Sequence, residues 1–370
     1  MSGAQDTPGL GSVPSHERLH RGSVSGWKSG SQGQRGGRAA AERHGAVYAA
    51  LDLGTNNCRL LVARPTSDSF RVVDAFSRII RLGEGVSNTG RISEAAIARA
   101  VDALSVCRDK MKLRGVTRAR LIATEACRTA ENGELFRQCI AERVGLELDI
   151  INRETEATLA AVGCTPLIDP RASGVVLFDI GGGSSELVRL GTPLPTRRGP
   201  PPPQIDGWVS MPYGVVTLAE RYGGQNVSVA DYEAMVEEVS VAVRPFAKAH
   251  RGSLEGVHLL GTSGTVTTIA GVHLALERYE RRRVDGCWMS ADEMRDVVSR
   301  LLAMSYEERV ASPCIGRERA DLVLAGCAIL EAICRAFPCP RLRVADRGLR
   351  EGMLVSLMRE DGVWERASAS

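Results

Sequence analysis

The sequence lacks any long apolar run. None of its segments approaches the roughly 20 consecutive apolar residues that a membrane-spanning helix needs. The first residues also lack the apolar segment of a secretory signal. We therefore expect a cytoplasmic protein without a membrane partner. The 370 residues, 44% of them apolar and 25% charged, predict a globular chain with room for two domains.

Histidine is scarce, and the cysteines lack the spacing of a metal site. Only six histidines are present, and none lies in a glycine-rich motif. This argues against a Ser-His or Cys-His nucleophile. The ten cysteines include no Cys-x-x-Cys pair and no His at zinc spacing, so we expect free thiols in a reducing compartment. Acid–base chemistry should then depend on carboxylates.

A large excess of charge of one sign is missing as well. The chain has 47 Lys and Arg against 44 Asp and Glu, a net charge of +3. Residues 1–46 hold six basic and three acidic residues, which accounts for the whole excess. A general nucleic-acid-binding surface is therefore not indicated, and we expect no specific nucleic-acid partner. Residues 1–45 are rich in Gly, Ser, Arg and Gln, which predicts a disordered tail.

Two strand-and-turn segments carry most of the information, Leu51–Asn57 and Phe178–Glu186. Each is an apolar strand with an acidic residue near its end, Asp52 or Asp179, followed by a glycine-rich turn with polar side chains. Backbone N–H groups of such turns can approach an anion closely, and an Asp at a strand end can hold a divalent metal. A third turn, Gly261–Thr265, follows another apolar segment. These turns predict half-sites that face each other across a cleft and grip a phosphate chain.

The hydrophobic pattern predicts strands that alternate with helices. Strands are expected at 47–51, 58–63, 70–75, 120–124, 146–151, 175–179, 186–190, 257–260 and 342–345. Helices are expected after a Ser93 cap, at 132–143, from 154 to 163, after 265, and at 231–243, 290–304, 319–337 and about 352–365. Residues 191–207, with prolines at 200–203, are expected to form an irregular surface loop. The repeated strand–turn–strand unit predicts an α/β protein of two similar domains.

Cleavage of a phosphoanhydride requires screening of its oxygens and a nucleophile placed in line. The three turns offer N–H groups and polar side chains for screening, and a metal could bridge Asp52 and Asp179. Glu186 closes the second turn, and Glu156 lies where a strand gives way to a helix. Either carboxylate could orient or deprotonate a water molecule. For Glu156, a plain first-turn glutamate that favours the helix dipole is the commoner interpretation at this point, and a catalytic role stays open.

Arginines are the expected contacts to the remaining phosphate oxygens. Arg128 follows a predicted strand, and Arg78 and Arg81 flank an apolar pair before a glycine. Two basic runs, at 110–120 and 278–283, are interpreted as solvated faces, which is what most charge runs form.

Seven segments, in order, give the sequence a resemblance to a known family. They are Ala50–Asn56, Arg81–Gly85, Thr124–Arg128, Glu156–Ala157, Asp179–Leu187, Gly261–Thr265 and Asp346–Gly352. From about Tyr48 to about Met358 the chain resembles the exopolyphosphatase / guanosine pentaphosphate phosphohydrolase (Ppx/GppA) phosphatase family, in a short two-domain form. The resemblance implies the fold of the actin–hexokinase–Hsp70 superfamily, an α/β fold of two ribonuclease H-like domains with an interdomain cleft.

The resemblance also implies roles for individual residues. Glu156 corresponds to the catalytic glutamate and Glu186 to a second active-site glutamate. Asp52 and Asp179 are the expected metal residues, with Mg²⁺ as the cofactor. The expected phosphate-binding residues are Gly54, Thr55, Asn56, Arg128, Gly181, Gly182, Gly183, Ser184, Ser185, Gly261, Thr262, Ser263 and Gly264.

In this family the last helix returns to the first domain. The expected division is a tail at 1–45, a first domain at 46–153 plus 353–366, and a second domain at 154–352 with the Pro-rich insertion 191–207. Longer family members carry further C-terminal helical domains, and without them processive action on long polyphosphate is less expected. Glu125 stands where the family usually has Asn, and Asn57-Cys58-Arg59 replaces a commoner Ser-containing version.

Three functions are compatible with these residues. The first is hydrolysis of a phosphoanhydride, releasing terminal orthophosphate from inorganic polyphosphate or the 5′-phosphate of guanosine pentaphosphate, with magnesium and water activated by Glu156. The alternatives are an ATP-dependent kinase of the same superfamily and a non-catalytic module that binds nucleotide or polyphosphate. A homodimer is the default expectation for such a protein.

Overall fold

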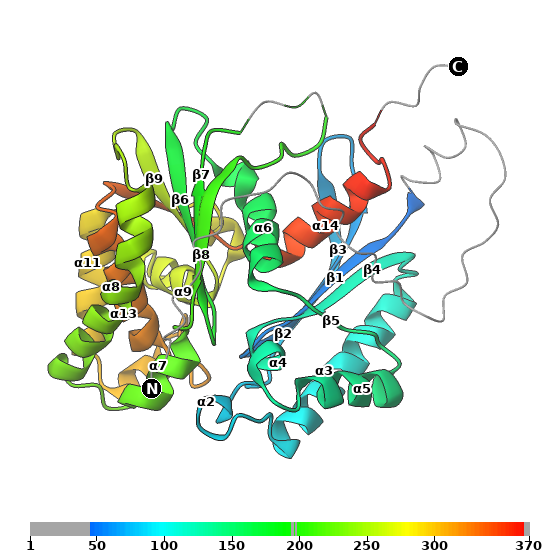
Figure 1. The fold of residues 1–370 in the computed structure, drawn as a ribbon, viewed down its shortest axis with the longest axis horizontal. Helices are drawn as coiled ribbons and strands as arrows, with labels where there is room; N and C mark the ends of the chain where they lie inside the picture. The colour runs from blue at the N-terminus through cyan, green and yellow to red at the C-terminus, as the bar shows by residue number, and fades with distance from the viewer. Residues whose placement is uncertain (1–44, 194–195, 197, 366–370) are drawn as a thin grey trace, which may run out of the picture.

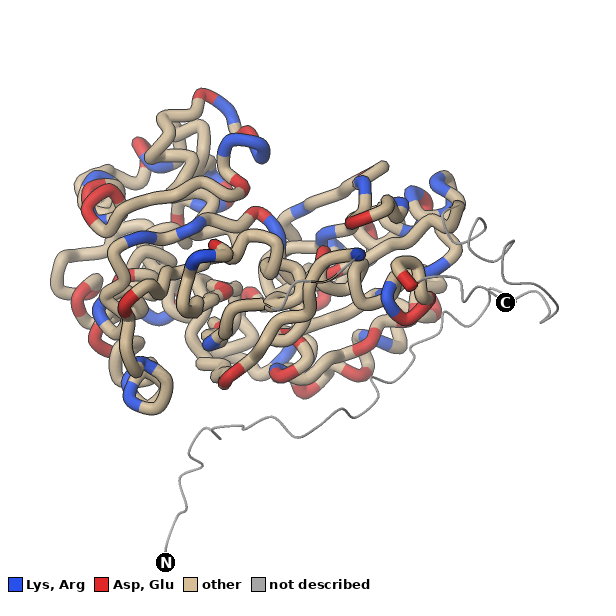
Figure 2. The backbone as a smooth tube through the Cα atoms, turned by 90° about the horizontal axis from the view of Figure 1, so that it is seen from above, with Lys and Arg blue, Asp and Glu red and all other residues tan. Residues whose placement is uncertain are grey.

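The computed structural model describes residues 45–193, 196 and 198–365. The predicted tail lies, except for Gly45, outside the described residues. The described chain forms two lobes, each built on one β-sheet with helices on its faces (Figure 1). Basic and acidic residues are interspersed over both lobes (Figure 2), in agreement with the small net charge. None of the helices within the described ranges is long and apolar enough to cross a membrane.

The first lobe contains a five-stranded sheet in the order β3-β2-β1-β4-β5. Its strands are β1 (Tyr48–Leu53), β2 (Asn57–Pro65), β3 (Phe70–Ile79), β4 (Arg118–Ala123) and β5 (Asp149–Ile150). The first three form an antiparallel meander, β4 runs parallel to β1, and β5 runs parallel to β4. Its helices are α2 (Val86–Thr89), α3 (Glu94–Leu113), α4 (Glu125–Thr129) and α5 (Gly133–Val144). Leu51 and Leu60 belong to the core on the side of α3 and α5, with Leu104 and Phe136.

The second lobe repeats this plan on a six-stranded sheet in the order β10-β11-β9-β6-β7-β8. Its strands are β6 (Gly174–Ile180), β7 (Ser185–Leu190), β8 (Ile205–Met211), β9 (Val257–Thr262), β10 (Trp288–Ser290) and β11 (Arg341–Ala345). β6, β7 and β8 again form an antiparallel meander, and β9 runs parallel to β6. Its helices are α7 (Val215–Tyr222), α8 (Val229–His250), α9 (Gly264–His273), α10 (Arg281–Val284), α11 (Ala291–Ala303), α12 (Tyr306–Ala311) and α13 (Val323–Ala336), with a 3₁₀ turn, η1, at Thr165–Leu167. The repeated meander is the duplication that the sequence predicts.

Two helices, α6 (Arg153–Cys164) and α14 (Leu349–Glu360), lie between the sheets (Figure 1). Leu159 of α6 and Met353 of α14 pack on the first sheet, whereas Ala157 of α6 packs on the second. The two helices approach so closely that a Cβ on Gly163 would lie 1.9 Å from the carbonyl oxygen of Gly348. This contact holds the C-terminal end of α6, whose first turn carries Glu156, against the start of α14.

The helix contact yields a stability prediction. Gly163→Ala forces the backbones of α6 and α14 apart, so we expect a loss of about 1–3 kcal/mol and a melting temperature lower by about 5 °C. Differential scanning calorimetry measures this. Gly45→Ala is the matched control, since a Cβ on Gly45 meets nothing within 4 Å; an equal effect of both substitutions would show that the close contact is not what matters.

Several predicted boundaries are wrong by a few residues. β8 begins at Ile205, inside the predicted irregular loop, because its backbone pairs with β7. β3 continues to Ile79, since its ladder with β2 extends that far. α13 begins at Val323 rather than at residue 319, because turns occupy residues 317–322, and α14 ends at Glu360 rather than near 365. The exact domain boundaries stay a prediction.

Candidate active site

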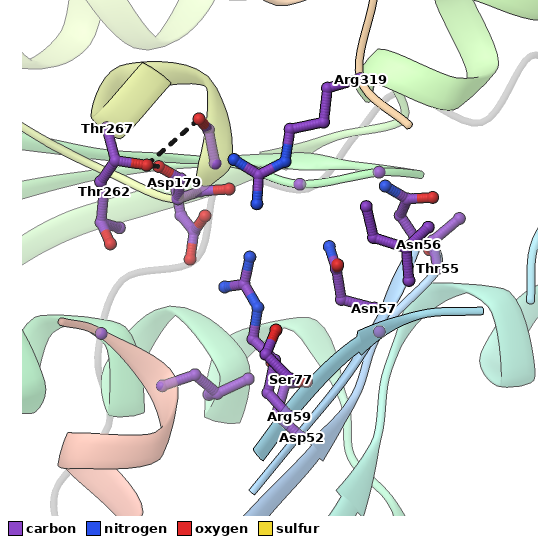
Figure 3. A pocket seen from close by; sticks show the side chains of 18 of the residues that line it. Asp52, Thr55, Asn56, Asn57, Arg59, Ser77, Asp179, Thr262, Thr267 and Arg319 are labelled. Carbon is purple, nitrogen blue, oxygen red and sulfur yellow. Dashed lines mark hydrogen bonds between the residues drawn. The ribbon is translucent and has the colours of Figure 1, made fainter. Parts of the chain in front are cut away.

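A cavity of about 640 Å³ lies between the two lobes, and residues of all three glycine-rich turns line it. Asp52 and Arg59 of the first lobe face Asp179 and Arg319 of the second across it (Figure 3). Most of the site residues predicted from the sequence line this cavity: Asp52, Gly54, Thr55, Asn56, Glu156, Asp179, Gly181, Gly182, Gly183, Ser184, Glu186, Thr262, Ser263 and Gly264. Sequence segments that lie far apart along the chain therefore share one site.

The first and second turns meet at Thr55. The first turn closes the β1–β2 hairpin, where the N–H of Gly54 donates to the carbonyl of Asn57 at 2.9 Å. A Cβ on Gly182 would lie 2.9 Å from Thr55 Cβ, and one on Gly183 would lie 2.9 Å from Thr55 Oγ1. The glycines of the second turn are thus required for the two lobes to come this close.

The second turn presents its backbone and one serine to the cavity. Ser184 Oγ donates to the Glu186 carboxylate at 2.8 Å, and Ser210 Oγ donates to the same oxygen at 2.8 Å. Ser185 does not line the cavity, because its hydroxyl donates to the carbonyl of Tyr213 at 2.6 Å. The prediction that the Ser185 side chain binds phosphate is therefore corrected.

The third turn brings the N-terminus of α9 to the cavity. Ser263 has a φ of 87°, and its hydroxyl donates to the carbonyl of Ile180 at 2.6 Å, which ties this turn to the end of β6. The first N–H groups of a helix have no intrahelical partner and favour anions. Gly261 does not line the cavity, contrary to the prediction, because it lies in β9 against Phe178, where a Cβ would be 2.5 Å from the ring.

Two glutamates face the cavity from different elements. Glu156 lies in the first turn of α6, and burial, followed by the nearby charge of Glu186, raises its pKa well above the ordinary value, while Arg128 opposes the shift. Burial, followed by the charge of Asp179, raises the pKa of Glu186 to about 7, against the hydrogen bonds from Ser210 and Ser184. Two neighbouring carboxyl groups whose pKa values are raised in this way are suited to acid–base chemistry.

Asp52 and Asp179 end equivalent strands in the two lobes. Burial raises the pKa of Asp52, and the charges of Arg59 and Arg350 oppose the shift. Burial, followed by the charge of Asp52, raises the pKa of Asp179 to about 6. A half-buried pair of carboxylates such as this gains from a cation between or beside them.

The matching of the chain to protein families agrees with this geometry. A model described as the Ppx/GppA phosphatase family matches residues 61–361. The chain belongs to this family. The resemblance inferred from the sequence motifs is thereby confirmed.

Two relatives match most of the chain in sequence. "Exopolyphosphatase 2" of Mycobacterium tuberculosis is 28% identical over 328 residues, which are 84% of this chain and 98% of the relative. A "guanosine-5′-triphosphate,3′-diphosphate pyrophosphatase" of Photobacterium profundum is 27% identical over 330 residues, 88% of this chain but 62% of that relative. The chain thus spans about three fifths of the second protein.

Solved structures of Ppx/GppA proteins confirm the predicted fold class. The crystal structure of the Aquifex aeolicus family member matches with a TM-score of 0.70 and 26% identity, covering 85% of this chain and 98% of that one. An exopolyphosphatase-like protein matches with a TM-score of 0.76 and 28% identity over the same shares. The chain therefore has the two-domain, actin-like α/β fold.

Arg128 does not line the cavity and is paired with carboxylates instead. Its Nε donates to Glu125 at 3.0 Å, its Nη1 to the carbonyl of Ile151 at 2.6 Å, and its Nη2 to Glu156 at 3.1 Å. Arg153 Nη2 binds the other oxygen of Glu125 at 2.8 Å. The guanidinium of Arg128 thus binds two carboxylates and holds Glu156, and its contact with phosphate stays a prediction.

Two other arginines, which the motif analysis missed, point into the cavity. Arg59 lies opposite Asp52 in the backbone ladder between β1 and β2, and Arg319 lies in the turn before α13 (Figure 3). A Cβ on Gly264 would lie 3.8 Å from Arg319 Cζ and 4.0 Å from Arg59 Nη2. Neither guanidinium pairs with a carboxylate among the residues that the structure describes, so both are free to bind an anion at the start of α9.

The basic run at 278–283 is not simply a solvated face, contrary to its interpretation from the sequence. Arg281 lines the cavity, and its Nη2 donates to the buried carboxylate of Glu351 at 2.8 Å. Glu351 in turn accepts from the N–H of Gly348 at 3.0 Å. Arg281 therefore fastens the segment before α14 at the edge of the cavity.

The carboxylates of the site fit a magnesium ion that is completed by phosphate oxygens. Within the described ranges, no group of three or more His, Cys, Asp and Glu side chains could hold a metal. Magnesium, however, is usually held by one or two carboxylates together with substrate phosphates and waters. Asp52 and Asp179, half-buried at the cavity, match that donor set.

Proposed function

We propose that the chain is a magnesium-dependent phosphoanhydride hydrolase. It releases the terminal orthophosphate of inorganic polyphosphate, the 5′-phosphate of guanosine pentaphosphate, or both. One observation carries this proposal: Glu156 and Glu186 line the same cavity as the three glycine-rich turns. The names of the two curated relatives, an exopolyphosphatase and a guanosine pentaphosphate pyrophosphatase, support it.

In this proposal Glu156 activates the attacking water. Its carboxylate takes one proton, the water oxygen forms a bond to the terminal phosphorus, and the bridging P–O bond breaks with its electron pair on the shortened chain. The orientation of Glu156 depends on Arg128, which donates to it at 3.1 Å. Glu186, held by Ser184 and Ser210, orders water in the same cavity.

Backbone and cationic groups of this chain hold the phosphates. The turns at 54–57 and 181–184 and the N-terminus of α9 supply N–H groups, and Arg59 and Arg319 supply charge. A magnesium ion held by Asp52 and Asp179 would supply further neutralisation of the non-bridging oxygens.

Removal of Arg319 should weaken substrate binding more than turnover. We expect Arg319→Ala to raise KM for tripolyphosphate about fivefold, because one charged hydrogen bond to the anion is lost. Steady-state phosphate release measures this. Arg300→Ala, on an exposed position of α11, is the control, and an unchanged KM in Arg319→Ala would remove this arginine from the binding site.

Activity should fall on the acid side of neutrality. The pKa values of about 7 for Glu186 and about 6 for Asp179 mean that both carboxyl groups gain protons as the pH falls through this range. Protons and the cation compete for the same carboxylates, so we expect the acid limb of kcat/KM to move to lower pH at higher magnesium. Profiles at two magnesium concentrations measure this, and an acid limb that stays in place would contradict it.

The proposal is tested by phosphate release from three substrates side by side. Short polyphosphate, long polyphosphate and guanosine pentaphosphate are each supplied with magnesium and with a chelator. Release that requires magnesium from at least one of them is expected. Silence on all three would contradict the proposal, and ADP formed from ATP and a sugar acceptor would favour a kinase instead.

A further inference from the structure

The segment Arg81–Gly85 of the first lobe reaches the second lobe directly. Arg81 donates through Nη1 and Nη2 to the two carboxylate oxygens of Asp321 at 3.0 and 3.1 Å. The two side chains are 33% and 22% exposed, so this ion pair is partly shielded from solvent. It is a two-pronged pair between residues 240 positions apart in the chain.

A second contact lies beside the first. The N–H of Gly85 donates to Glu220 Oε1 at 2.7 Å, and Ser87 Oγ donates to the other oxygen of the same carboxylate. Glu220 belongs to α7, which lies near α2 at the bottom of Figure 1, away from α6 and α14. This contact therefore joins the lobes at a place separate from α6 and α14.

The same segment also supports the first phosphate turn. The N–H of Gly83 donates to the carbonyl of Thr55 at 2.8 Å, and the N–H of Arg81 donates to that of Asn56 at 3.0 Å. A Cβ on Gly83 would lie only 2.3 Å from Thr55 Cγ2. The turn that receives phosphate and the contact between the lobes are thus parts of one short, tightly packed segment.

The backbone of Arg81 is held in an unusual conformation that aims its side chain. Its φ is 46°, in the left-handed region that residues with a Cβ rarely adopt. Arg99 fixes this turn by donating to the carbonyls of Ile80 at 2.7 Å and Arg81 at 3.1 Å. The left-handed backbone of Arg81 costs free energy. It is retained in the fold, where it directs the guanidinium of Arg81 to Asp321.

We propose that Arg81, Asp321 and Glu220 form an interlobe latch that holds the cleft closed and sets the Thr55–Asn56 turn for the terminal phosphate. The proposal rests on the function proposed above. The three residues are positioning residues, since they act through the turn and do not line the main cavity. If the latch is broken, open forms of the cleft are populated. The apparent affinity for substrate then falls in proportion to the fraction of molecules that stay closed.

Charge reversal tests the latch. We expect Arg81→Asp and Asp321→Arg each to raise KM for tripolyphosphate about fivefold with kcat within about twofold of wild type. The double variant, which restores the pair in reverse, should recover most of the loss. Asp is suited to position 81 because it tolerates the left-handed conformation. Arg81→Gly, which relieves the backbone and removes only the side chain, should behave as the single variants do.

The matched control is Arg137→Asp. Arg137 is 31% exposed, like Arg81, but its ion pairs with Glu134 and Glu147 stay within the first lobe. This variant should leave KM unchanged.

Small-angle X-ray scattering of the substrate-free proteins gives a readout that does not depend on activity. The single variants should have a larger radius of gyration than wild type, and the double variant should not. An active wild type with unchanged KM and radius in the single variants, or a double variant no better than the singles, would overturn the latch. A wild type inactive on every substrate would overturn the proposed function instead, while the scattering would still test the latch.

Discussion

Glu156→Gln should lower kcat by about two orders of magnitude or more, as expected for loss of a general base. Glutamine has nearly the same shape and can still accept the hydrogen bond from Arg128 Nη2, but it cannot take a proton from water. Because the charge of Glu186 raises the pKa of Glu156, the neutral side chain also removes a repulsion, so the fold should not suffer. Steady-state phosphate release gives kcat, and calorimetric titration with tripolyphosphate shows whether binding survives.

The control for this substitution lies two residues away. Glu154 is in the same first turn of α6 but is exposed, so Glu154→Gln should leave kcat and binding unchanged. Turnover near the wild-type value in Glu156→Gln would remove Glu156 from the mechanism and leave it as a helix-dipole residue.

The second large effect is expected on the magnesium requirement. Asp179→Asn should raise the magnesium concentration for half-maximal activity by at least about tenfold, the usual scale for damage around a metal ligand. The amide keeps the size of the side chain but removes the negative charge that, beside Asp52, favours a cation. Titration of activity with magnesium measures the change, and the dependence of the melting temperature on magnesium measures it without turnover.

Asp206→Asn is the matched control, since Asp206 lies in the same sheet but is exposed. An unchanged magnesium titration in Asp179→Asn would mean that Asp179 only supports the second turn, and the metal assignment would fail.

The convergence of the three turns could be predicted because each has a local signal. The local signal is an apolar strand, then an acidic or hydroxyl residue, then glycines, and it occurs at Asp52, Asp179 and Thr262. The duplicated unit implies that the ends of these strands face one another. The fold class followed from the same repetition. Glu156 was identifiable only through the family motif, since a first-turn glutamate is common in any helix.

The charged partners could not be predicted, because their pairing depends on tertiary contacts. Arg128 seemed free for phosphate, but Glu125 and Glu156 bind it from two elements. Arg319 was expected inside a helix, whereas a turn directs it into the cavity. A charge run read from sequence does not tell which of its members finds a buried carboxylate.

The partners of the interlobe latch could not be predicted from the sequence either, because they lie even further apart along the chain. The motif around Arg81 was recognised as a family segment, yet nothing local to it indicates Asp321 or Glu220, which lie 240 and more than 130 residues further along the chain. Only the approach of α7 and of the turn before α13 to the first lobe reveals what the motif contacts. Gly83 carries a local signal, but its reason, the closeness of Thr55, is also tertiary.

In the proposed mechanism, water activated in the interlobe cavity attacks the terminal phosphorus. Hydrolysis of tripolyphosphate in ¹⁸O-labelled water, followed by mass spectrometry of the products, shows which phosphorus is attacked. We expect one labelled oxygen in each released orthophosphate, with the rate of labelling reduced by Glu156→Gln. Unlabelled orthophosphate with label in the remaining pyrophosphate, or transfer of the phosphoryl group to another acceptor, would contradict it.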